Sequence, residues 1–335
     1  MLLKVRHVGL CGSDLNTFRG RNPLADLPRV PGHEIGGRIV ETGAAVPAEV
    51  APGANAIIFP NTNCGTCTAC RKGRVNACQF NATLGVQRDG GMSDFLCVPW
   101  EKLILNDVLL ARHLALIEPL SVGFHAIARD RVYQRETVVV LGGGIIGVGA
   151  MLGALERGAE VIADDISEAK SEALLSLGGR AVIDPGEQDA LAAIRDLTGG
   201  NGADVTVKAV GLPETFLAAV DLASFAGRGA YVGHVREKVA YDTAPFNLKE
   251  LDMYGSRNAT REDFEAVIAF VAANPEPSDR LILRVFFGND TRESFAWWES
   301  NRNKTFKAVV EFPEWPRSEP HFSTEHTACR VEPRS

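Results

Sequence analysis

Residues 137–158 read TVVVLGGGIIGVGAMLGALERG, and this stretch decides the fold. A run of β-branched residues ends in glycine, and an apolar helical pattern begins directly after it. Strand-like runs and helical patterns then alternate as far as Arg257. This alternation predicts right-handed βαβ units and a parallel, doubly wound sheet, which makes the fold class α/β. The further predicted strands of this sheet are 160–165, 180–184, 203–210, 229–234 and 251–256.

Three glycines stand between the first of these strands and its helix. Gly142, Gly144 and Gly147 give the pattern G-x-G-x-x-G, in which the first glycine permits a tight turn and the second lets a pyrophosphate approach the backbone. The third lets the helix and the strand pack closely. The helix starts with Ile145 and Ile146, so its N-terminal amides face the phosphates. A glycine-rich turn can be purely structural, but the strand and helix around this one favour a dinucleotide site.

An acidic residue at the end of the next strand strengthens this interpretation. Asp165 is placed to accept hydrogen bonds from both ribose hydroxyls and to repel a 2′-phosphate, which predicts NAD in preference to NADP. Lys170 is a further candidate for contact with the same ribose. Val210 and Arg257 come at the ends of two later strands and are the remaining cofactor candidates, with Arg257 at the nicotinamide end.

Four cysteines crowd into the segment CGTCTACRKGRVNAC. Cys64, Cys67, Cys70 and Cys78 have the spacing C-x2-C-x2-C-x7-C, and four thiolates at this spacing can wrap one tetrahedral zinc ion. The alternative is a set of disulfides in a secreted protein, but the N-terminal segment MLLKVRHVGLCG is too short and too charged for a signal peptide. We therefore predict a closed structural zinc site and a reducing, cytoplasmic location.

A second and different metal signal precedes the cysteine segment. Cys11 lies in CGSD, and His33 and Glu34 lie in PGHEIGG. Taken alone, Cys11 is more often a small buried apolar residue, and His33 is more often a hydrogen-bonded loop histidine. Together with Glu34 they predict a mixed zinc site with an open position, where the ion acts as a Lewis acid toward an oxygen ligand. The chain is thus expected to bind two zinc ions.

The composition excludes several classes of function. The chain has 335 residues, of which 45% are hydrophobic and 23% charged, and its net charge is −7. These values predict a globular protein of two domains without a basic face for nucleic acid. No apolar run reaches the ~20 residues that a membrane-spanning helix needs. We expect a small-molecule substrate and neither a nucleic-acid nor a membrane partner.

Together these motifs resemble those of the zinc-dependent medium-chain alcohol and polyol dehydrogenases. The run GHEIGGRIVETGAAV matches the zinc signature of that family. CGSD, the four-cysteine lobe, the IEPL segment and the Rossmann core follow in the family's order. The segment IEPLSVGFHA resembles the branch that contains sorbitol, threonine and sugar-acid dehydrogenases. The resemblance extends from Leu2 to Phe312.

The resemblance implies two domains with the active site in the cleft between them. A mostly β, GroES-like catalytic domain would consist of residues 1–121 and 259–312 and would carry the structural zinc lobe at 64–78. A Rossmann NAD-binding domain would consist of residues 122–258. Residues 313–335 are polar and rich in proline, so we predict a disordered tail there.

The resemblance also implies a role for each residue of the mixed site. Cys11, His33 and Glu34 would bind the catalytic zinc, and Glu118 would be a fourth ligand or would bond to a zinc-bound water. Glu118 precedes a proline, so the alternative for this carboxylate is that it caps a helix.

Three polar residues near Cys11 complete the implied site. Asp14 would orient the ring of His33, and Ser13 would contact the reacting hydroxyl and pass its proton on. Many relatives carry a histidine at the position of Asn16, and an asparagine cannot gain or lose a proton near neutral pH. Either water completes the proton relay or the pH optimum lies higher.

The implied reaction is the NAD-dependent oxidation of a secondary hydroxyl in a polyol or sugar acid, by a homodimer or homotetramer. A threonine-type amino-alcohol dehydrogenase is the alternative within the enzyme class. A third possibility is an NAD-binding sensor or scaffold that has lost turnover, which Asn16 would fit. Relatives also have a β-hairpin before the CGSD strand that is missing here, and its absence predicts an unpaired edge at the first strand.

Several side chains are candidates for binding the substrate itself. Phe18 would form an apolar wall of the pocket, as an aromatic residue does at that position in relatives. Arg257 would pair with a carboxylate and Asn258 would bind hydroxyls. The remaining clamp candidates, which are otherwise solvated surface charges, are Arg19, Arg21 and Arg29.

Overall fold

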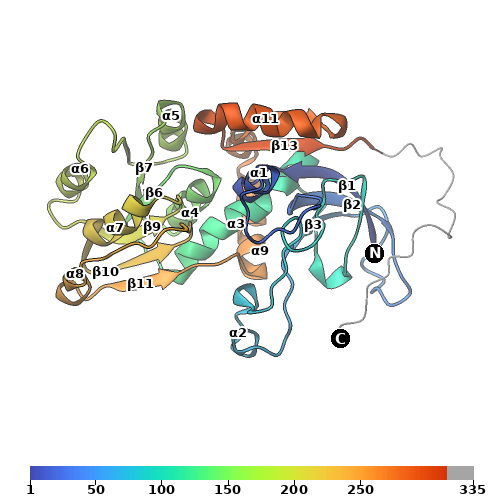
Figure 1. Ribbon diagram of the computed structural model, residues 1–335, viewed down its shortest axis with the longest axis horizontal. Helices are drawn as coiled ribbons and strands as arrows, with labels where there is room; N and C mark the ends of the chain where they lie inside the picture. Colours follow the sequence, from blue (N-terminus) through green and yellow to red (C-terminus); the bar gives the residue numbers. More distant parts are fainter. Residues whose placement is uncertain (315–335) are drawn as a thin grey trace.

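The computed structural model of the chain describes residues 1–314 and divides their strands between two sheets (Figure 1). The sheets lie side by side, with helices between and around them. All but the first two residues of the predicted tail, 313–335, lie outside the described residues. Among the residues that the structure describes, no helix is both long enough and apolar enough to cross a membrane.

One sheet is parallel and has the strand order β11-β10-β9-β6-β7-β8. The chain runs outward from β6 in one direction and then returns to continue from β9 in the other, which makes the gap between β6 and β9 the topological switch point. The predicted doubly wound α/β fold is thus confirmed. The strands are β6 (Thr137–Leu141), β7 (Glu160–Asp164), β8 (Ala181–Ile183), β9 (Ala203–Lys208), β10 (Ala223–Tyr231) and β11 (Asp252–Gly255).

The described chain contains eleven α-helices. They are α1 (Gly12–Phe18), α2 (Thr68–Arg71), α3 (Leu114–Arg129), α4 (Ile145–Glu156), α5 (Glu168–Ser176), α6 (Ala190–Leu197), α7 (Pro213–Leu222), α8 (Ala244–Leu248), α9 (Arg261–Ala273), α10 (Pro275–Leu281) and α11 (Thr291–Asn301).

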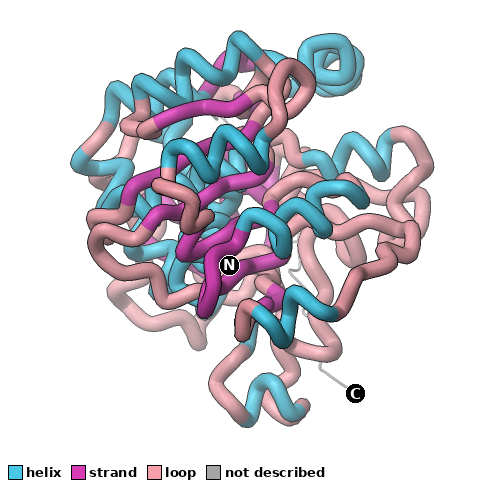
Figure 2. Tube along the Cα trace, turned by 90° about the vertical axis from the view of Figure 1, so that its left-hand side faces the viewer, coloured by secondary structure: helices cyan, strands magenta, loops and turns pink. Residues whose placement is uncertain are grey.

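Alternate residues of β6 show why helices cover both faces of the parallel sheet. Val138 and Val140 pack in one core cluster with α3 and α4, whereas Val139 and Leu141 pack in another with α6 and α7. Successive side chains of a strand point to opposite faces, so a strand buried on both faces reads as a continuous apolar run. In the turned view of Figure 2, helices lie on both sides of the strands.

The other sheet is mostly antiparallel and contains both ends of the described chain. Its strand order is β12-β13-β1-β2-β3-β5, and β4 also pairs with β1. The strands are β1 (Leu2–Gly9), β2 (Glu34–Glu41), β3 (Asn55–Ile58), β4 (Phe95–Cys97), β5 (Leu103–Leu105), β12 (Ile282–Phe287) and β13 (Lys307–Glu311).

Strand β1 is paired on both sides, so the prediction of an unpaired edge at the first strand is wrong. His7 pairs with Glu311 of β13 and with Gly36 of β2. The partner on one side comes from the far end of the described chain, and no local sequence pattern reveals such a pairing. The edges of this sheet are instead β12 and β5.

The segment with the four cysteines forms a lobe that projects away from both sheets (Figure 1). It carries α2 and a short 3-10 helix, η1 (Val75–Ala77). We call residues 64–78 the cysteine lobe.

Candidate active site

The predicted metal ligands of the mixed site come from the ends of two paired strands. Gly9, at the end of β1, pairs with Glu34, at the start of β2. Cys11 follows Gly9 closely and His33 directly precedes Glu34, so the register of one strand pair brings all three side chains together. One ligand atom from each of Cys11, His33 and Glu34 lies within 4.8 Å of the others. A thiolate, an imidazole and a carboxylate at this separation are a donor set suited to zinc.

Asp14 fixes the two loops that carry these ligands. Its carboxylate accepts hydrogen bonds from the backbone amides of Cys11 (3.0 Å) and Gly32 (3.1 Å), and the residue is 1% exposed. The distance from its Oδ1 to His33 Nδ1 is 3.7 Å, which is longer than a hydrogen bond. The structure thus places Asp14 beside the ring, as the sequence suggested, with the backbone amides as its present partners. Burial opposes a charge on His33, but Asp14 and Cys11 raise the pKa of His33 well above its usual value.

Glu34 has a partner that the sequence analysis missed. Both of its carboxylate oxygens accept from Lys307 Nζ, at 2.7 and 2.6 Å, and Nζ also donates to the carbonyl oxygen of Leu10 at 3.0 Å. The side chains of Glu34 and Lys307 are 0% and 1% exposed. Lys307 lies in the otherwise apolar strand KAVVE, and a lysine in such a strand is the signal that could have revealed it.

Glu118 lies inside α3 rather than at its start, so the alternative that it caps a helix is wrong. It is not among the atoms that cluster within 4.8 Å, which come from Cys11, His33 and Glu34. Burial and the nearby Glu34 carboxylate raise the pKa of Glu118 to about 7, although His33 and Lys307 oppose this rise. Glu118 therefore faces the same site while lying outside the group of potential ligand atoms.

Ser13 is the one hydroxyl beside this cluster without a hydrogen-bond partner among the described residues. Its Oγ is buried, and it lies in the first turn of α1, two residues after Cys11. A buried polar atom without a partner is costly, so such an atom commonly awaits water or a ligand. The candidate relay position, Asn16, is exposed on the same helix.

The four cysteines of the lobe form a second potential metal site. Their sulfurs all lie within 4.8 Å of one another, and none of the four is in a disulfide. Cys64 and Cys70 are 4.0 Å apart, and Cys67 and Cys78 are 3.9 Å apart. Sulfurs of a tetrahedral zinc site with bonds of about 2.3 Å are roughly 3.8 Å apart, so the spacing fits a zinc ion. The Thr66 hydroxyl and backbone amides lower the pKa of Cys64 to about 6, whereas burial and the neighbouring cysteines raise the pKa of Cys70 to about 11. The geometry of the four sulfurs, rather than these pKa values, therefore supports a metal site.

Two of the three glycines in the turn are required by the backbone. Gly142 has φ +98°, and a side chain on Gly147 would lie 1.9 Å from the carbonyl oxygen of Gly142. Both positions therefore need glycine. Val210 packs against Gly142 from the end of β9, across the switch point. Ile145 is the first residue of α4, and Ile146 follows it.

Asp165 lies directly against the glycine turn. Its Oδ2 accepts from the amide of Gly143 at 2.8 Å, and its Oδ1 accepts from the amide of Ser167 at 2.9 Å. These bonds hold the carboxylate at the end of β7, where the ribose of a dinucleotide is expected. Lys170 is 9% exposed, and its Nζ lies 5.9 Å from the ring centre of Phe306.

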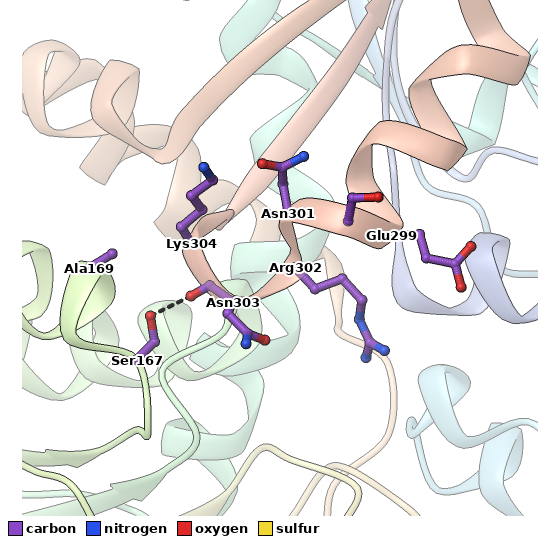
Figure 3. A pocket seen from close by; sticks show the side chains of 8 residues that line it. Ser167, Ala169, Glu299, Asn301, Arg302, Asn303 and Lys304 are labelled. Carbon is purple, nitrogen blue, oxygen red and sulfur yellow. Dashed lines mark hydrogen bonds between the residues drawn. The ribbon is translucent and has the colours of Figure 1, made fainter.

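A cavity of about 380 Å³ adjoins Ser167 (Figure 3). The Ser167 hydroxyl donates to the carbonyl oxygen of Asn303, so two segments far apart in sequence meet here. Figure 3 shows Ser167 and Ala169 on one side of this cavity and Arg302 and Lys304 on the other. Ser167 lines this cavity and also donates its backbone amide to Asp165, so the cavity lies next to the segment that Asp165 holds.

Two of the candidates for the substrate clamp have partners within the protein. Arg19 donates to Glu299, and Arg29 donates to Asp89 at 3.0 Å, so these two arginines are engaged in ion pairs on the surface. The sequence could not reveal these two ion pairs, because ion pairs between distant segments leave no local pattern in it.

The other clamp candidates are more varied. Arg21 and Arg257 are exposed. Asn258 uses its amide nitrogen to donate to the carbonyl oxygen of Asn76 at 2.9 Å, so its nitrogen is turned toward the cysteine lobe. Phe18 is 49% exposed and stacks on Phe295, with ring centres 5.0 Å apart.

Comparisons with known proteins agree with this architecture. The model of the alcohol dehydrogenase GroES-like domain matches residues 1–107, and the zinc-binding dehydrogenase model matches residues 146–273. The chain is 33% identical to L-galactonate-5-dehydrogenase of Escherichia coli (strain K12), over 93% of this chain and 91% of that protein. It is 34% identical to sorbitol dehydrogenase of Bacillus subtilis (strain 168), over 92% and 89%.

A solved structure shows the same arrangement in three dimensions. A zinc-binding dehydrogenase from Sinorhizobium meliloti 1021, bound to NADP, superimposes with a TM-score of 0.84 at 29% sequence identity. The match covers 93% of this chain and 91% of that protein. The GroES-like and dehydrogenase models, the relatives and the two groups of potential metal ligands all agree, and the chain belongs to the zinc-dependent medium-chain dehydrogenase family.

Proposed function

We propose that this protein oxidises a secondary hydroxyl of a polyol or sugar acid and transfers the hydride to NAD. The observation that carries the proposal is the cluster of Cys11, His33 and Glu34 in a chain that also has a glycine turn for a dinucleotide. The relatives named for L-galactonate and sorbitol support the substrate class.

We assign the metal sites as the sequence predicted them. Cys11, His33 and Glu34 would hold a catalytic zinc, which would supply a Lewis acid for the substrate oxygen. A second zinc would be held by the cysteine lobe and would stabilise its fold. The domain boundaries after residues 121 and 258 belong to the same proposal.

The side chains around the cluster would position the substrate and its proton. Ser13 Oγ has no hydrogen-bond partner in the described part of the chain, so it would be available to accept or donate at the reacting hydroxyl. Glu118, whose pKa is raised to about 7 by burial and Glu34, could hold a proton or a water near the same oxygen. Asp14 would keep the two ligand loops together through its bonds to the amides of Cys11 and Gly32.

We propose NAD as the preferred cofactor because of Asp165. Its carboxylate is held against the glycine turn by two backbone amides, where it would accept from ribose hydroxyls and repel a 2′-phosphate. The Sinorhizobium meliloti relative was solved with NADP, so the family includes a protein that binds the phosphorylated cofactor. Gly142, Gly144 and Gly147 would serve either cofactor, with Lys170 and Val210 as neighbours.

Arg257 remains our candidate for binding a substrate carboxylate, because it follows the last strand of the parallel sheet and is exposed. We further propose a homodimer or homotetramer that works in the reducing cytoplasm, where the lobe thiols stay free to bind zinc. Light scattering after gel filtration tests the oligomeric state.

A substrate panel tests the proposed reaction. The growth of NADH absorbance is followed with NAD and a set of polyols, aldonates, L-threonine and unbranched primary alcohols, with and without a chelator. We expect chelator-sensitive activity with a polyol or sugar acid. A clear preference for L-threonine would select the amino-alcohol alternative, and NAD binding without turnover on any substrate would select the sensor or scaffold.

A further inference from the structure

A buried chain of hydrogen bonds joins the cysteine lobe to α3, to α9 and to the turn that follows β11, and it lies outside the cluster of Cys11, His33 and Glu34. Its centre is Asn76, in η1 of the lobe, which is 2% exposed. Asn76 Nδ2 lies 2.9 Å from His125 Nε2 and 2.8 Å from the carbonyl oxygen of Arg257. His125 Nδ1 lies 2.7 Å from Asp263 Oδ2, and these two residues are 7% and 8% exposed.

The partners fix every donor and acceptor in this network. The carbonyl oxygen of Arg257 can only accept, so the atom of Asn76 that faces it must be the amide nitrogen. The second hydrogen of that nitrogen then goes to His125 Nε2, which must be unprotonated. His125 Nδ1 therefore carries the proton and donates to Asp263. The neutral tautomer of His125 with its proton on Nδ1 satisfies every hydrogen bond of this buried network. A doubly protonated ring or a rotated ring would break at least one of these bonds.

The network also fixes the turn that connects β11 to α9. Asn258 Nδ2 donates back to the carbonyl oxygen of Asn76, and Asp263 Oδ2 accepts from both the backbone amide and the hydroxyl of Thr260. The turn 257–260 is therefore bonded at its first, second and fourth residues. In Figure 1 the chain leaves β11 and runs toward α9 next to the lobe that carries α2.

This turn borders the half of the crevice that would take the nicotinamide. It begins at the carboxyl end of β11, where the amide of Ser256 donates to the carbonyl oxygen of Tyr231 at the end of β10. Gly233, just beyond β10, packs against Val210, and Val210 packs against Gly142. The strands β9, β10 and β11 form the second mononucleotide half of the sheet, while the ribose residue Asp165 belongs to the first half.

We propose that Asn76 and His125 are positioning residues that hold the turn 257–260 at the nicotinamide end of the cofactor site. On this view the cysteine lobe, with its metal bound, acts as a fixed support for one half of the cofactor site. The inference rests on the dinucleotide binding proposed above. It goes further because it assigns a role in cofactor binding to a lobe that contributes no ligand to the cluster of Cys11, His33 and Glu34.

The test compares two ligands that differ only in the nicotinamide end. Binding of NADH and of ADP-ribose is measured on the metal-loaded protein, by NADH fluorescence and by calorimetry. For Asn76→Ala we expect the dissociation constant of NADH to rise about tenfold, while that of ADP-ribose changes less than about twofold. A loss of general folding would weaken both ligands equally, so the ratio of the two constants reports positioning.

Two variants outside the lobe guard against loss of its metal. Asn258 has φ +51°, a conformation that glycine adopts without strain, so Asn258→Gly removes one bond to Asn76 and leaves the turn free to keep its shape. His125→Ala removes the acceptor of Asn76. Both variants should retain two zinc ions per chain, and both should bind NADH more weakly than wild type while their affinity for ADP-ribose changes less. If Asn76→Ala itself loses zinc, these two variants decide the matter.

The matched control is Asn81→Ala. Asn81 lies just beyond the cysteine lobe, and its Nδ2 bonds only two residues away, to Thr83 Oγ1 at 2.9 Å. We expect its affinities for both ligands to stay at the wild-type values. Equal NADH affinity in wild type, Asn258→Gly and His125→Ala would overturn the positioning role. Failure of the wild-type protein to bind ADP-ribose would instead overturn the dinucleotide site, and with it both proposals.

Discussion

Replacing Lys307 by methionine should destabilise the metal-free protein strongly. Lys307→Met keeps the length of the side chain but removes three hydrogen bonds, two of them to the Glu34 carboxylate. Glu34 is fully buried, so its charge would then lie in the interior without a cation beside it. Because both partners are buried, solvent screening does not reduce this effect.

The expected cost follows from measurements on other buried ion pairs. Breaking such a pair from one side costs about 3–5 kcal/mol, because the remaining charge is uncompensated. Removing both charges is far less costly, so Glu34→Gln combined with Lys307→Met should recover most of the loss. The comparison of the two single variants with the double variant isolates the pair from the other contacts of each residue.

The assay follows unfolding in urea with a chelator present. Trp298 of α11 packs in the same core cluster as Leu3, Ile35 and Val310, so tryptophan fluorescence reports on the sheet that carries the pair. With a slope of about 2–3 kcal/mol per molar urea, the Lys307→Met midpoint should fall by roughly 1–2 M. A midpoint shift smaller than about 0.3 M would refute the reasoning. A double variant that is no more stable than Lys307→Met would refute it as well.

Three further predictions concern pH, cofactor and metal. Burial raises the pKa of Asp130 to about 8 from its usual 3.8, and neither carboxylate oxygen has a hydrogen-bond partner within residues 1–314, so ionisation of this residue opposes folding. The stability contribution of its protonated form is present below about pH 4 and is lost as the pH rises to about 8, at up to about 1.4 kcal/mol per pH unit. The thermal stability of Asp130→Asn relative to wild type should therefore increase between pH 5 and 8 and stay at that level above pH 8. The exposed residue Asp26 provides the control variant, Asp26→Asn. A stability difference that does not change with pH, or one no larger than that of Asp26→Asn, would contradict this prediction. Asp165→Ser should narrow the ratio of kcat/KM for NAD over NADP, and a wild-type enzyme that favours NADP would show that Asp165 is misassigned. Freshly purified protein should contain two zinc ions per chain. Mild chelation should remove the catalytic ion first and abolish activity, while the circular dichroism spectrum of the fold is retained. A single zinc ion per chain in active protein would contradict this prediction. Cys70→Ser should instead destabilise the cysteine lobe.

The sequence was sufficient wherever the chemistry is local. The glycine turn at Gly142 and its strand and helix span about twenty residues, and Gly142 and Gly147 each have a stereochemical reason to be glycine. The four cysteines likewise fall within a single short segment, so their spacing alone predicted that they would meet. The mixed cluster was harder, since Cys11 and His33 are separated in sequence, and only the combined motifs suggested it.

Contacts between distant segments were out of reach of this reasoning. Lys307 reaches Glu34 because β13 pairs with β1, and β1 pairs with β2. The same pairing removes the edge that the short N-terminus suggested. Arg19 finds its carboxylate on α11, at Glu299, and this too depends on how the elements pack. A charged residue in an apolar strand was visible in the sequence, but its partner was not.

The polar groups of the site fall into two kinds: those with hydrogen-bond partners in the protein, and those whose partners would come from a ligand. Asp14 has a backbone donor on each oxygen, and Glu34 has Lys307, so these two carboxylates are satisfied within the protein. Ser13 Oγ and His33 Nδ1 are buried without partners among the described residues, although buried polar atoms are paired as a rule. The Nδ1 atom is only about 0.5 Å beyond hydrogen-bond range of Asp14, so a small shift of the ring would complete that bond. Cys11, His33 and Glu34 would hold the metal, and Ser13 Oγ would contact the substrate hydroxyl. Among the described residues of the site, Ser13 Oγ is thus the buried atom left for a ligand, whereas His33 Nδ1 lies a short distance from its protein partner Asp14.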